Sequence, residues 1–151
     1  MKNLLTIILT SVCVIVPVLA EQSEQDYSTA RSGVRFAPLH IYLDSGNRNL
    51  AAYQFELKAA TGQIKIVGVE GGEHQAFKEA PYYDPAALAK DRIIIAAFNT
   101  GSDLPKGRTR IATIHLQITG DAEPQYELKL AVAADADGKE IPAEITFEKG
   151  E

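Results

Sequence analysis

Apolar and polar residues alternate along residues 50–59, LAAYQFELKA. One set of alternate positions is apolar: Ala51, Tyr53, Phe55, Leu57 and Ala59. A period of two is typical of a half-buried β-strand. A shift of one residue would turn Phe55 and Leu57 towards water, so the register of this strand is strongly specified. Other strands are therefore expected to cover its apolar face.

The same alternation predicts further strands, separated by turns rich in Gly, Asn and Asp. These strands fall at residues 39–43, 64–69, 112–118, 126–132 and 145–147. Residues 93–98, IIIAAF, are apolar throughout, which predicts a strand buried on both faces. The segment 80–90 is irregular, and within it Asp84 and Pro85 predict the N-cap and first position of one helical turn.

No helical period is sustained between residues 34 and 147. Several short strands at close spacing predict an all-β fold, either a sandwich or a barrel. As a two-sheet sandwich, it would hold Phe55, Phe98, Leu116 and Leu130 between the sheets.

The N-terminus has the order of a secretory signal peptide, which we place at residues 1–20. Lys2 precedes a short apolar run, and the small-residue cleavage site ends at Ala20. The protein is therefore expected to be secreted or periplasmic, and its mature form is not expected to span a membrane; the alternative is an uncleaved anchor. Residues 21–33 are polar and predict a flexible leader before a domain at 34–150. The single cysteine, Cys13, lies in the signal segment, so the core must hold the domain without a disulfide.

Charge and motifs argue against several classes of function. The net charge is −5 and the basic residues are scattered, so no nucleic-acid partner is expected. No glycine-rich phosphate loop or nucleophile elbow is found, so we expect no enzyme. The sequence DADG at 135–138 begins like a calcium loop but lacks the third acid and the distal glutamate, so a plain turn is favoured. No metal and no cofactor are expected.

Four segments together resemble a cohesin domain, of the wider carbohydrate-binding-module-like sandwich superfamily. They are AAYQFEL at 51–57, IVGVEGG at 66–72, GRTRIATIHL at 107–116 and ADADGKEIP at 134–142. The resemblance covers about residues 34–147 and implies a jelly-roll sandwich of about nine strands with a non-enzymatic binding role, to dockerin modules in cohesins. Many cohesins carry Tyr-Asp-Pro-x-x-Leu directly after the first of these segments, whereas here it occurs later, at Tyr83–Leu88.

The first candidate site is the segment Pro81–Pro85, which contains Tyr82, Tyr83 and Asp84. Two adjacent tyrosines on a proline-stiffened loop cannot easily both face the core. An exposed tyrosine suits a sugar ring or a protein hot spot. The alternative is that one of the two closes the end of the sandwich.

The second candidate site is a flat polar face containing Gln54 and His115. It would exist only if the strands that carry these residues belong to one sheet. Such a face is either the solvated side of a sandwich or, as the cohesin resemblance implies, a docking surface. Likewise, His40 and His115 could meet only if their strands are neighbours.

These observations predict an exported, non-catalytic binding module whose partner is a protein, for example a dockerin-like module. The alternative is a carbohydrate-binding module that recognises polysaccharide through Tyr82 and Tyr83.

Overall fold

The computed structural model describes residues 33–150. The predicted signal peptide at 1–20, and all of the predicted leader except Gly33, lie outside the described residues. Within the described part, no helix has the length and apolar character needed to cross a membrane.

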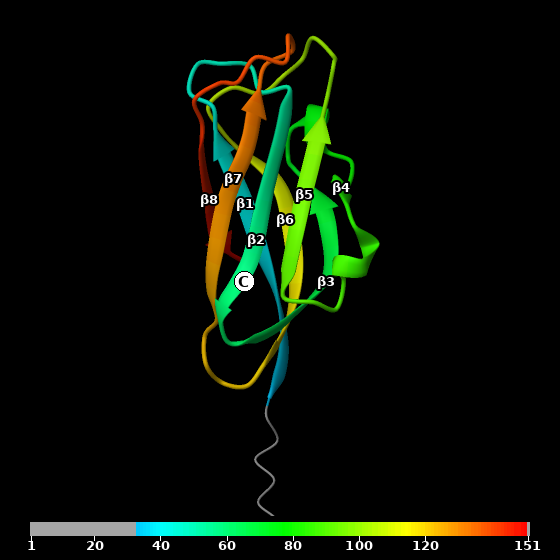
Figure 1. The fold of residues 1–151 in the computed structure, drawn as a ribbon, viewed down its shortest axis with the longest axis vertical. Helices are drawn as coiled ribbons and strands as arrows, with labels where there is room; N and C mark the ends of the chain where they lie inside the picture. Colours follow the sequence, from blue (N-terminus) through cyan, green and yellow to red (C-terminus); the bar gives the residue numbers. More distant parts are fainter. Residues whose placement is uncertain (1–32, 151) are drawn as a thin grey trace, which may run out of the picture. The chain divides into compact units, whose positions relative to one another are not determined.

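The described residues form eight strands and two short 3-10 helices, so the prediction of an all-β sandwich is confirmed (Figure 1). The strands are β1 Val34–Asp44, β2 Ala52–Thr61, β3 Gln63–Gly71, β4 Tyr82–Tyr83, β5 Arg92–Phe98, β6 Arg108–Thr119, β7 Gln125–Ala134 and β8 Glu144–Lys149. The 3-10 helices are η1 Gln75–Phe77 and η2 Pro85–Ala87. The expected number of about nine strands is wrong for the described part, which has eight.

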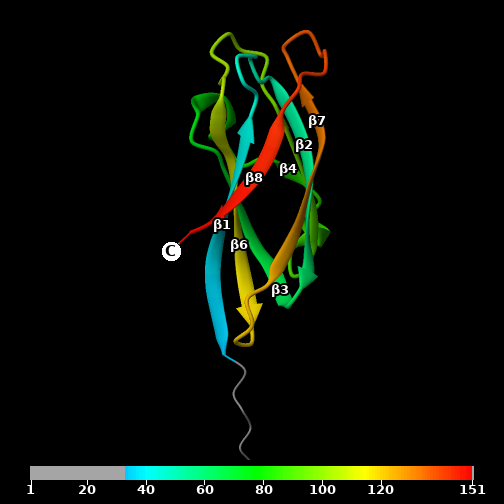
Figure 2. The same cartoon turned by 90° about the vertical axis from the view of Figure 1, so that its left-hand side faces the viewer.

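Two antiparallel four-stranded sheets lie face to face, as Figures 1 and 2 show. One sheet has the order β3-β6-β1-β8 and the other the order β4-β5-β2-β7. The strand predicted from the alternation at residues 50–59 is β2, which lies inside its sheet between β5 and β7. Its Phe55 is opposite Ile95 on β5 and Leu130 on β7.

The core lies between the sheets and follows the predicted alternation of β2. Tyr53, Phe55 and Leu57 are all buried, as expected. Tyr53 donates its hydroxyl to the Ile111 carbonyl of the facing sheet at 2.9 Å. The one polar atom of this side chain is therefore satisfied inside an apolar core.

Strand β5 corrects two predictions about the core. Phe98 was expected between the sheets, but it is 65% exposed, and Ile94 is 45% exposed. Ile93 and Ile95 are the inward residues of β5, so the period of two turns Ile94 and Phe98 outward. The run 93–98 is not buried on both faces because the sandwich covers only the inner face of β5.

Burial raises the pKa of Tyr53 well above the ordinary tyrosine value of about 10. At higher pH the unfolded chain therefore releases a proton that the folded chain keeps. Stability linked to Tyr53 is complete below pH ~10 and falls above it by up to about 1.4 kcal/mol per pH unit. We expect denaturant unfolding between pH ~8 and ~11 to show this fall in the wild type and a shallower one in Tyr53→Phe. Parallel curves for the two proteins would contradict the prediction.

Candidate binding face

The outer face of the β4-β5-β2-β7 sheet brings two predicted site residues into one row. Tyr82 is opposite Ala96, Ala96 is opposite Gln54, and Gln54 is opposite Val132. Direct cross-strand partners point to the same side of a sheet. Tyr82 and Gln54 therefore share one face, separated by the strand β5.

This face carries an unusual number of large apolar side chains for the outside of a sandwich. Four of the seven exposed large hydrophobic residues in the described part lie on it: Tyr82, Ile94, Phe98 and Val132. The rings of Tyr82 and Phe98 have centroids 6.0 Å apart and planes only 11° from parallel. Outer faces of antiparallel sheets are usually polar, so an apolar face of this kind marks a candidate interaction surface. We call it the β5 face.

A groove of about 670 Å³ adjoins the aromatic pair at the end of the β5 face. Its walls come from η1, the start of β4 and the segment after β5. Asn99 ties these walls together, because its Nδ2 donates to the Ala76 carbonyl at 3.0 Å and its Oδ1 accepts from the Gly101 N–H at 2.7 Å. The buried Phe77 anchors η1 to the core, because its ring packs edge-on against Tyr53 with 5.1 Å between the ring centroids.

Tyr83 and Asp84 have local roles that separate them from Tyr82. Tyr83 is half-buried and packs against the core, while Tyr82 is 69% exposed. Tyr82 is therefore exposed as a binding residue would be, whereas Tyr83 packs against the sandwich. Asp84 caps η2, accepting from the Ala86 N–H at 2.9 Å, as its predicted N-cap position requires.

His115 lies on the other sheet, so the condition for a shared polar face with Gln54 is not met. The outer face of the sheet that carries His115 bears polar contacts at several places along β6. Arg108 pairs with Glu148 at 2.6 Å and lies over the Tyr42 ring at 3.7 Å. His115 Nε2 lies 3.1 Å from Glu70 Oε1, although in a geometry that forms no hydrogen bond.

His40 and His115 do lie on neighbouring strands, but their side chains have different partners. Pro38 is opposite His115, and His40 is opposite Thr113. His40 Nδ1 lies 3.1 Å from the Thr113 hydroxyl. No group of three or more His, Cys, Asp or Glu residues in the described part is arranged to hold a metal ion.

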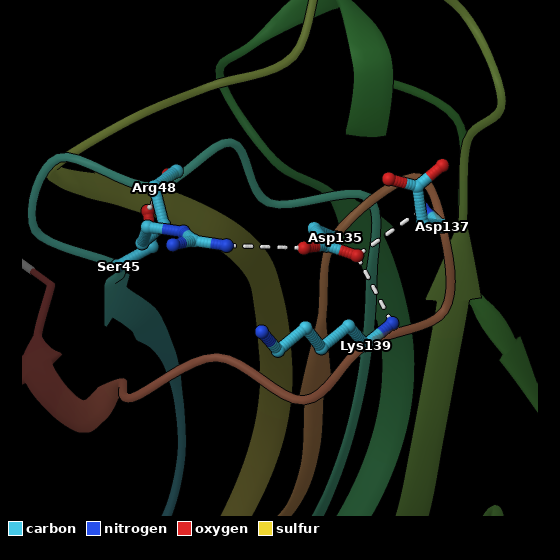
Figure 3. Close-up of polar contacts among 5 residues, drawn as sticks. All are labelled: Ser45, Arg48, Asp135, Asp137 and Lys139. Carbon is cyan, nitrogen blue, oxygen red and sulfur yellow. Dashed lines mark hydrogen bonds and ion pairs between the residues drawn. The ribbon is translucent and has the colours of Figure 1, made fainter.

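The DADG segment forms a turn in which protein donors occupy the Asp135 carboxylate (Figure 3). Its Oδ1 accepts from the N–H groups of Lys139 and Asp137, at 3.0 and 3.1 Å, and its Oδ2 pairs with Arg48 at 3.2 Å. The Lys139 N–H, followed by that of Asp137 and the Arg48 guanidinium, lowers the pKa of Asp135. The carboxylate therefore links two neighbouring turns of the fold.

Phe98 is the residue of the β5 face that sequence reasoning assigned to the core instead. The signal was present, because Ile93 and Ile95 share one parity and Phe98 has the other. An uninterrupted apolar run hides that parity, since both faces then look alike.

No protein-family model, no curated protein and no solved structure matches the chain.

Proposed function

We propose that this protein is an exported, non-catalytic binding module that docks a protein partner on the β5 face. The observation that carries the proposal is the gathering of Tyr82, Ile94, Phe98 and Val132 on one outer face. The other sheet carries the remaining three exposed large hydrophobic residues, Val34, Phe36 and Val67, and its outer face bears ion pairs. The proposal agrees with what the cohesin resemblance implies, a non-enzymatic module that recognises another protein.

The chemistry of the β5 face favours a protein over a glycan. Ile94, Val132 and Ala96 offer apolar area without hydrogen-bonding groups, whereas small polar ligands need precisely placed donors and acceptors. A protein interface typically combines an apolar centre, aromatic anchors and a polar rim. Arg92 and Glu56, paired at 2.6 Å, form part of such a rim on the same face.

Recognition of polysaccharide is the second candidate function. One observation favours it, the near-parallel, exposed rings of Tyr82 and Phe98, because flat aromatic faces suit sugar rings. In that case binding would depend on the two rings and not on Ile94 or Val132.

Capture of exported proteins from the source organism on the immobilised full chain tests the proposal. We expect at least one protein to be retained by the wild type and bound about 30-fold more weakly by Ile94→Ser/Phe98→Ala, the loss of a typical hot spot. His115→Ala, on the opposite face, is the matched control and should bind as the wild type does. Loss with His115→Ala alone would move the interface to the other sheet.

Sedimentation with insoluble polysaccharides separates the two candidate functions. Sedimentation of the wild type that Tyr82→Ala and Phe98→Ala abolish, while Ile94→Ser does not, would replace the protein partner with a glycan. No sedimentation would remove the second candidate.

A further inference from the structure

The charged side chains that line the groove beside the aromatic pair are all acidic. Glu79 and Asp103 contribute carboxylates to its lining, and no lysine or arginine is among the described residues that line it. Asp103 has an 85% exposed side chain, so its charge is available to a ligand in the groove. The whole chain carries a net charge of −5, which adds a long-range preference for a cation.

Two polar side chains beside the groove, Asn99 and His74, hold its wall in place through hydrogen bonds. Asn99 uses both polar atoms of its side chain on Ala76 and Gly101. His74 Nδ1 accepts from the Ala76 N–H at 3.2 Å, which leaves the proton of a neutral ring on Nε2, 3.8 Å from Asp103 Oδ1. These contacts fix the wall, whereas the side chains of Glu79 and Asp103 are exposed.

We infer that the groove receives an arginine side chain of the protein partner. The planar guanidinium stacks on aromatic faces, which Tyr82 and Phe98 present, and pairs with carboxylates, which Asp103 and Glu79 supply. The apolar residues of the β5 face then contact the partner residues that lie next to that arginine. This inference rests on the proposed function and names the partner chemistry at one end of the same face.

The test uses acetyl-arginine amide and acetyl-citrulline amide as probes, since citrulline has nearly the same shape without the charge. Amide NMR spectra of the isotope-labelled full chain report where each probe binds. We expect arginine to shift the signals of residues 98–103 and to bind about fivefold to tenfold more tightly than citrulline, the sum of an exposed cation–π contact and an exposed ion pair.

Two double variants of equal charge separate local pairing from the overall field. Glu79→Gln/Asp103→Asn should weaken arginine binding about fivefold, whereas Glu127→Gln/Asp137→Asn, outside the groove, should change it less than twofold. Tyr82→Ala should weaken arginine binding by a similar factor to the first double variant. The spectra themselves show whether each variant remains folded.

The outcomes also separate this inference from the proposed function. Equal binding of citrulline and arginine, or equal effects of the two double variants, would overturn the inference. If a captured partner still depends on Ile94 and Phe98, the proposed function stands without it. Arginine binding in the groove with no captured protein would support the inference and count against the proposed function.

Discussion

Replacing Phe55 with alanine is expected to lower the free energy of unfolding by about 3–5 kcal/mol. Phe55 is fully buried in the middle of β2 and stacks on Tyr53, with 6.0 Å between ring centroids. Partners on both sides, Ile95 and Leu130, hold the strand in place, so the cavity left by the ring cannot easily collapse. Equilibrium urea unfolding measures the loss as a shift of the midpoint at constant slope.

Phe98→Ala is the matched control because it removes the same ring from the paired neighbouring strand. Phe98 is 65% exposed and its main aromatic contact is with Tyr82, so the expected loss is below about 1 kcal/mol. Equal losses for the two variants would mean that Phe98 is in the core after all, and would remove it from the β5 face.

The second large effect is expected at Gly72, where alanine should lower the free energy of unfolding by about 1–3 kcal/mol. A Cβ atom there would overlap the Arg110 carbonyl oxygen and lie 2.9 Å from Ile111 Cα. That carbonyl cannot simply move away, because it accepts from the Glu73 N–H at 3.0 Å. Gly72 also donates to the Phe77 carbonyl at 2.7 Å, so the strain reaches η1 and the groove.

Gly68→Ala provides the control for Gly72→Ala, because Gly68 lies within β3 four residues earlier and Gly72 directly follows that strand. Its Cβ atom would meet His115 side-chain atoms at 3.7 Å, an ordinary contact distance. We expect a change within about 0.5 kcal/mol. Thermal or urea unfolding measures both changes, and a tolerated Gly72→Ala would show that the backbone at residue 72 can shift away from β6.

Seven of the eight strands could be located from the sequence, because each longer strand carries its own alternation or apolar run. Strand β4 could not, since two residues cannot show a period, and Tyr82–Tyr83 becomes a strand only by pairing with Ala96 and Ile95. Sheet membership was also out of reach. β2 and β6 have the same alternating pattern, yet they belong to different sheets, and no local signal distinguishes them.

The candidate site depended on that missing information. Local chemistry predicts a site at Tyr82, and a face shared with His115 predicts one at Gln54, but only the register of β4, β5 and β2 places Tyr82 and Gln54 on one face. Phe98 was assigned to the core because its hydrophobicity favours burial, whereas its position relative to Ile95 turns it outward. The same separation of sheets placed His115 on the opposite face.

The position of β1 inside its sheet has a consequence for how the chain folds. Both neighbours of β1, the strands β6 and β8, come from the later part of the sequence, and β8 is the last strand. Pairings of such high sequence separation require large loops to close before any contact stabilises them. Folding on a millisecond-to-second timescale is therefore expected. During synthesis, residues 34–44 have no partner strand until β6 has been made, and their sheet is complete only after β8.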